Sequence, residues 1–82
     1  MGIFNKAEAP SIGQDAAKAI ADGRSVFVAM LPVRLKDTTA SREIEAWSEE
    51  IMSIEQAGWL LTQTSTVEDN SLATMYCVFH RR

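Results

Sequence analysis

An amphipathic stretch at residues 40–57, closed by a glycine, constrains the fold more than any other feature of the sequence. Its apolar residues recur three or four positions apart, at Ala40, Ile44, Trp47, Ile51 and Ile54. Five glutamates occupy the rest of the stretch. This spacing predicts one long helix that buries a single face. Gly58 follows where helices commonly end in a left-handed residue, and Trp59 can then fold back onto Ile54.

Two strand-like segments follow this helix, at residues 59–67 and 72–80. Residues 68–71, Glu-Asp-Asn-Ser, are typical of a turn, so the two segments form a predicted hairpin. Strict alternation places Trp59, Leu61, Gln63, Ser65 and Val67 on one face of the first strand. In the second strand it places Met75, Cys77 and Phe79 on one face, and Tyr76, Val78 and His80 on the other. Apolar groups on both faces indicate a central strand.

The N-terminal half predicts a further helix and a further strand. The helix begins at Pro10-Ser11 and stops at Gly23, and residues 25–31 are apolar on both faces of the strand. Pro32 cannot donate a ladder hydrogen bond and therefore belongs at an edge or a bulge, beyond which residues 33–35 continue the strand. Residues 1–9 are predicted to be a flexible arm, and residues 10–82 a single domain.

These elements predict an α+β fold with the order α-β-α-β-β. A helix connects the first two strands, so they run parallel with a right-handed crossover. Placing the third strand between them gives an antiparallel sheet with the spatial order 1-3-2. The main helix, 40–57, covers one face of this sheet. Trp47, at the centre of its stripe, is predicted to be the residue whose replacement by alanine is most damaging.

The second face of the sheet is left with apolar side chains that monomers seldom expose. We therefore expect a homo-oligomer, a dimer or higher, in its simplest form a two-fold dimer that packs sheet on sheet. The candidate residues for an interface, or for a pocket at the subunit seam, are Phe27, Tyr76, Val78, Trp59 and Phe4. In the alternative, the first helix and the arm fold over this face within one chain.

The sequence carries no pattern that predicts a catalytic, cofactor or metal site. Cys77 and His80 are the only cysteine and histidine, too few for a zinc site without carboxylates from elsewhere. Net charge is −3, and residues 37–58 hold six acidic residues against one arginine. Nucleic-acid binding is therefore disfavoured. No apolar run is long enough to span a membrane, and the single cysteine fits a reducing compartment, so we expect a cytoplasmic protein.

The C-terminal half resembles a family of small bacterial and actinobacteriophage proteins of unknown function. Residues 58–61, Gly-Trp-Leu-Leu, follow an amphipathic helix, and residues 73–81, Ala-Thr-Met-Tyr-Cys-Val-Phe-His-Arg, form a closing strand. In that family a helix ends in Gly-Trp-x-Leu and the closing strand ends in Phe and Arg. The resemblance covers residues 42–82 and implies a helix followed by a hairpin, with no catalytic residues to carry over.

The sequence thus favours a non-enzymatic, homo-oligomeric protein of interaction or scaffold type, and the resemblance implies that it could be encoded by a phage. One alternative is a small-ligand binding module whose pocket lies at a subunit interface and is lined by Trp59 or Tyr76. The other is a regulator that binds nucleic acid or a host protein through basic residues at the strand ends.

Overall fold

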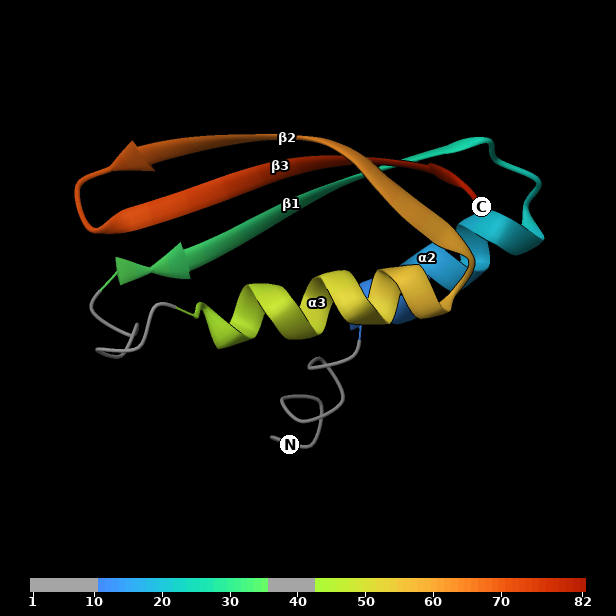
Figure 1. Cartoon of the computed structure of the whole chain (residues 1–82), viewed down its shortest axis with the longest axis horizontal. Coiled ribbons are helices and arrows are strands. Elements are labelled where there is room, and N and C mark those ends of the chain that lie inside the picture. The colour runs from blue at the N-terminus through green and yellow to red at the C-terminus, as the bar shows by residue number, and fades with distance from the viewer. Residues whose placement is uncertain (1–10, 36–42) are drawn as a thin grey trace, which may run out of the picture.

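A three-stranded antiparallel sheet and two helices make up the part of the chain that the computed structural model describes, residues 11–35 and 43–82 (Figure 1). The elements, in chain order, are α2 (Ser11–Ala21), β1 (Val26–Arg34), α3 (Glu45–Gln56), β2 (Trp59–Asp69) and β3 (Leu72–Arg81). This is the predicted α-β-α-β-β order of an α+β fold.

The strand order β1-β3-β2 confirms the predicted topology. Both outer strands pair antiparallel with β3, so β1 and β2 run parallel to each other. Pro32 lies in the edge strand β1, opposite Thr74, as expected for a residue that cannot donate to a ladder on both sides. The central position of β3 explains why its residues are apolar on both faces.

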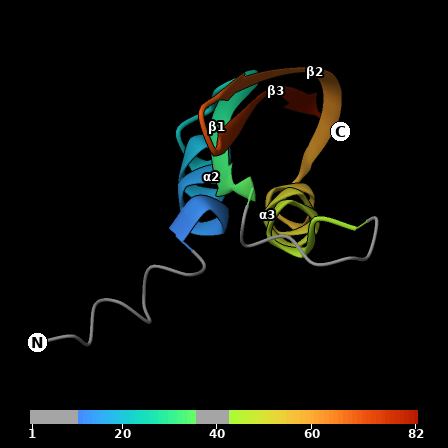
Figure 2. The ribbon, with the colours of Figure 1, turned by 90° about the vertical axis from the view of Figure 1, so that its left-hand side faces the viewer.

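Both helices lie on the same face of the sheet (Figure 2). The alternative prediction, in which the first helix covers the second face, is therefore wrong for this helix; the arm at residues 1–9 lies outside the described residues. Gly13 permits a close approach between the helices, because a Cβ atom there would lie 3.1 Å from Cβ of Ser53 in α3. Helix α2 ends at Gly23 in a Schellman motif, with Gly23 N–H donating to the Ile20 carbonyl and Arg24 N–H to that of Ala19.

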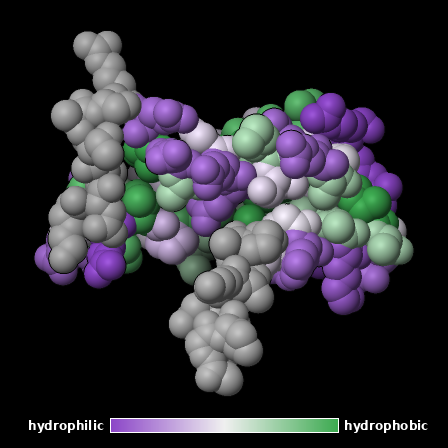
Figure 3. Space-filling model, turned by 90° about the horizontal axis from the view of Figure 1, so that it is seen from below, coloured by the Kyte–Doolittle hydropathy of each residue, from purple (hydrophilic) through white to green (hydrophobic). Residues whose placement is uncertain are grey.

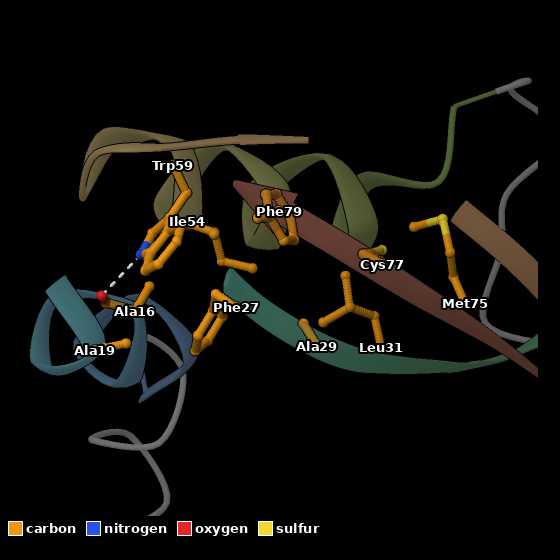
Figure 4. Packing of buried hydrophobic residues seen from close by; sticks show 10 residues of the cluster. All are labelled: Ala16, Ala19, Phe27, Ala29, Leu31, Ile54, Trp59, Met75, Cys77 and Phe79. Atoms are coloured by element: carbon orange, nitrogen blue, oxygen red, sulfur yellow. Dashed lines mark hydrogen bonds between the residues drawn. The ribbon is translucent and has the colours of Figure 1, made fainter. Parts of the chain in front are cut away.

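The hydrophobic core fills the space between the helices and the sheet (Figure 4). It is composed of Ala16, Ala19, Phe27, Ala29, Leu31, Ile54, Trp59, Met75, Cys77 and Phe79. Trp59 is fully buried and donates its indole N–H to the Ala16 carbonyl at 2.9 Å. Its ring stacks on Phe27 with the ring centroids 5.7 Å apart. Trp59 therefore joins α2 to the sheet at the point where α3 ends.

Helix α3 begins later than predicted. Residues 40–42 lie outside the described residues, Glu43 and Ile44 are not helical, and the first helical residue is Glu45. The N-cap residue Ile44 makes no side-chain capping bond, since an apolar side chain has no acceptor to offer. Trp47 is only partly buried and packs against the rim of the core, so it is not the central residue that the helical spacing predicted.

Strand β2 contains a β-bulge that the sequence did not predict. The register with β3 shifts between Leu61 and Gln63, so Thr62 is an extra residue. Trp59 and Leu61 share one face of β2, as predicted, and this face points toward the helices. Beyond the bulge the alternation inverts, and Gln63, Ser65 and Val67 face away from the helices, contrary to the prediction. The strands also extend further into the turn, since Asp69 pairs with Leu72 and only residues 70–71 connect them.

Candidate interaction surface

The sheet face that points away from α2 and α3 is the candidate functional surface, and we call it the outer face. It comprises Val26, Val28, Met30, Pro32 and Arg34 of β1; Leu72, Thr74, Tyr76, Val78 and His80 of β3; and Leu60, Gln63, Ser65, Val67 and Asp69 of β2. Among the described residues, seven large apolar side chains are exposed, and six of them belong to this face. Such a concentration is typical of a surface that a partner covers.

Cross-strand pairing arranges the outer face into rows with an apolar centre. Met30, Tyr76 and Ser65 form one row, and Val28, Val78 and Gln63 form the next. Met30 and Val28 are each 61% exposed, and Tyr76 is 42% exposed. Arg34 and Asp69 lie in the row at one end of the face, and His80 lies in the row at the other. An apolar centre with a polar rim is the usual anatomy of a protein interface.

The outer face is large enough to support a modest interface. Strands about 4.8 Å apart that rise about 3.3 Å per residue give a face about 14 Å wide and about 30 Å long, or about 400 Å² in plan. A stable complex of standard size buries about 800 Å² on each partner. The outer face of one chain therefore provides about half of the area of a standard interface.

The bulge at Thr62 fixes the end of the outer face that carries His80. The Thr62 hydroxyl donates to the Val78 carbonyl at 3.0 Å and lies 2.9 Å from Nδ1 of His80. With its own hydrogen directed to Val78, the hydroxyl accepts from His80, which assigns the proton of that ring to Nδ1. Both partners are exposed, and the contact orients the ring rather than preparing it for proton transfer.

Among the residues that the structure describes, Glu50 and Cys77 are the titratable groups that the fold perturbs, and they face the inner side of the sheet. Burial raises the pKa of the Cys77 thiol, and the nearby Glu50 carboxylate raises it further. A thiol held in its neutral form is a poor nucleophile. Burial also raises the pKa of Glu50, with a second contribution from Glu49, and its buried Oε1 has no hydrogen-bond partner. Because a charge on either group makes ionisation of the other less favourable, this pair disfavours a Cys77 thiolate.

Of the residues predicted for an interface or pocket, Tyr76 and Val78 lie together on the outer face. Phe27 and Trp59 lie in the core on the opposite side of the sheet and have almost no surface to offer a partner. Phe4 lies outside the described residues. Sequence reasoning missed five exposed apolar members of the outer face: Val28, Met30, Leu60, Val67 and Leu72. Alternation along β1 contained the signal for Val28 and Met30, whereas Val67 depends on the bulge.

The helix side of the molecule has a different character (Figure 3). Hydrophilic side chains are spread over much of this side, with smaller apolar areas between them. The described residues hold no group of three or more His, Cys, Asp or Glu side chains that could bind a metal ion. Within the same residues, no helix is long and apolar enough to cross a membrane.

Comparison of the chain with protein-family models, with curated proteins and with solved structures found no match in any of the three. The resemblance to small bacterial and phage proteins therefore stays a prediction, and the outer face is the feature of the molecule that points to a function.

Proposed function

We propose that this protein is a non-enzymatic, self-associating interaction module whose outer face packs against the outer face of a second copy. The observation that carries the proposal is the gathering of six exposed large apolar side chains on one open sheet face. Burying them removes apolar surface from water, which stabilises an association by roughly 25 cal/mol for each Å² buried.

A two-fold axis through the centre of the face suits this surface. In such an isologous contact the same patch is buried on both copies, and every contact between two residues occurs twice. One face can therefore complement itself. Two sheets packed in this way cross at about 30° and interdigitate their side chains over about 10 Å. Met30, Tyr76 and Val78, in the two adjacent rows near the middle of the face, would form the buried part of the contact, with Arg34, Asp69 and His80 at its rim.

Mass measurement by size-exclusion chromatography with light scattering tests this proposal. We expect the full chain at micromolar concentration to have at least twice its monomer mass of 9.1 kDa. Met30→Glu places a charge in the middle row of the outer face, where the contact would bury it, and should lower the measured mass of the protein. Met52→Glu is a matched control, because Met52 is 53% exposed on α3, away from the outer face, and should leave the mass unchanged. A parent protein that is strictly monomeric would exclude the proposal.

A small-ligand module at a subunit seam is the second candidate, and it now depends on Tyr76 alone. Trp59, the other predicted lining residue, has its ring and its indole N–H committed to the core. Tyr76 is the only aromatic residue on the outer face. Quenching of flavin fluorescence on titration with the full chain, lost in a Tyr76→Ala variant, would favour this candidate over self-association alone.

A further inference from the structure

Strand β2 has one backbone edge that no described strand pairs. It stands at the end of the order β1-β3-β2, so β3 satisfies only one of its sides. All residues from Thr62 to Asp69 are exposed. A row of N–H and C=O groups along such an edge is a template on which another strand can pair.

The two edge strands of the sheet differ in how they are protected. β1 contains Pro32, which removes a donor, and Arg34, and both features discourage pairing with another strand. β2 contains no proline, lysine or arginine, and residues 60–67 carry no charge and are rich in Thr, Val and Leu. Apart from Glu68 and Asp69 at its end, the bulge at Thr62 is its one protective feature, and it leaves residues 63–69 in regular register with β3.

We propose that β2 pairs antiparallel with β2 of a second copy, around a two-fold axis at Thr64. When that axis is perpendicular to the sheet, outer-face residues of one copy must oppose outer-face residues of the other. With Thr64 opposite itself, Gln63 opposes Ser65 of the second copy. Thr62 is an extra residue and has no counterpart in this pairing, so the register shifts by one position at the bulge. Val67 of one copy therefore opposes Leu60 of the other. These two exposed apolar side chains, 54% and 49% exposed, thus meet on the same face.

The charges at the two ends of β2 are complementary in this arrangement. Glu68 and Asp69 end β2, and they approach the start of β2 in the second copy. Trp59 at that start pairs with Arg81, which Arg82 follows along the chain. Two strand spacings separate opposing charges by about 10 Å, roughly one Debye length at 0.1 M salt, so the attraction within each pair is partly screened and weakens as salt rises.

Edge pairing also resolves the small size of the outer face. It joins two sheets into one of six strands with a continuous outer face, which doubles the area from about 400 to about 800 Å² in plan. That area reaches the standard size of a stable interface. Two such sheets packed face to face contain four copies. The four-copy assembly rests on the proposed function, whereas the edge contact does not.

Charge variants at Thr64 test the edge contact, because only a residue on the two-fold axis opposes itself. We expect the full chain to have about four times its monomer mass of 9.1 kDa. Thr64→Lys and Thr64→Glu each place like charges opposite one another and should halve that mass. An equimolar mixture of the two variants should restore it. Thr64→Val, which is uncharged and β-branched, should retain the parent mass. Circular dichroism confirms that each variant folds.

The outcomes separate the edge contact from the face contact. If Thr64→Lys and Thr64→Glu both keep the parent mass, or their mixture is no heavier than either alone, the edge contact at Thr64 is overturned. If Met30→Glu lowers the mass in that case, the face contact stands without it. If Met30→Glu has no effect while the Thr64 variants lose mass and their mixture regains it, the face contact fails and the edge contact stands. A strictly monomeric parent overturns both.

Discussion

The two tryptophans occupy opposite ends of the helix–sheet contact, and they differ in how fully they are enclosed. Each donates its indole N–H to a backbone carbonyl at 2.9 Å, Trp59 to Ala16 and Trp47 to Leu31. Trp59 is fully buried, stacks on Phe27, and has the Arg81 guanidinium 6.0 Å from the centre of its ring. Trp47 is only partly buried.

This difference shows that helical spacing identifies which face of a helix is buried but not how deeply. Trp47 lies in the first turn of α3, and its indole N–H bonds to the carbonyl of Leu31 in the edge strand β1. Trp59 lies where α3 turns into β2, and it meets α2 and β3 as well. Arg81 strengthens that corner by donating to the carbonyls of Arg24 and Ile20, near the end of α2. The contact between the helices and the sheet is therefore most extensive around Trp59.

Trp59→Ala should have the largest effect on stability. It removes a fully enclosed aromatic ring and leaves a cavity, which lowers the free energy of unfolding by about 3–5 kcal/mol. Urea denaturation followed by circular dichroism measures the loss. Trp59→Phe is the matched control, because it keeps a ring beside Phe27 and loses only volume and the N–H bond to Ala16. A Trp59→Ala variant as stable as the parent would mean that the Trp59 ring is not buried in solution.

Trp47→Ala should destabilise the protein less than Trp59→Ala, by about 1–2 kcal/mol, since a partly exposed ring loses less transfer free energy and one hydrogen bond. This ranking reverses the one that helical spacing alone predicts. The same denaturation measured at equal protein concentration compares the two variants, because self-association makes stability depend on concentration. A larger loss for Trp47→Ala would show that the α3–β1 end is the firmer one.

Glu50→Gln should have the smallest effect, and one that depends on pH. Burial holds the pKa of Glu50 in the folded chain above its ordinary value of 4.5, so the folded state binds this proton more tightly than the unfolded state. The contribution of Glu50 to stability is therefore greatest at low pH and is lost as pH rises from 4.5 through the raised pKa. Glutamine cannot ionise, so the variant should lose this slope and gain stability at neutral pH relative to the parent.

Urea denaturation at a series of pH values from 4.5 to neutral checks the Glu50 prediction. Glu49→Gln is its control, since Glu49 is an exposed neighbour on α3 that only adds to the perturbation of Glu50. Equal slopes for the parent and Glu50→Gln would mean that Glu50 is solvated in solution.

The arrangement of the elements could be predicted because several local signals agree. Gly58 marks the end of a helix, and the spacing of the apolar residues changes there from three or four positions to two. Strand β3 is apolar on both faces, which places it between its neighbours. The outer face could be anticipated in β1 and β3 by simple alternation. Tyr76 and Val78 were identified in this way.

The rest depends on contacts that periodicity does not encode. The bulge at Thr62 is stabilised by hydrogen bonds to Val78 and His80, which are 16 and 18 positions away. The local sequence of residues 59–67 contains no pattern that predicts it. The burial of Trp59 depends on Ala16, which is 43 positions away. The position of α2 follows from the close approach at Gly13, and sequence spacing leaves open which face of the sheet a short helix covers.

The central position of β3 has a consequence for how the chain reaches its folded state. β1 and β2 are hydrogen-bonded to β3 and not to each other, and β3 is the last of the three strands along the chain. During synthesis no sheet pairing involving β1 can form until residues 72–81 have emerged, since local contacts join only the hairpin. The apolar segments of α2, β1 and α3 must wait unpaired until then. Folding should accordingly be a single late step. Aggregation or chaperone binding would compete with folding during the period before β3 has emerged.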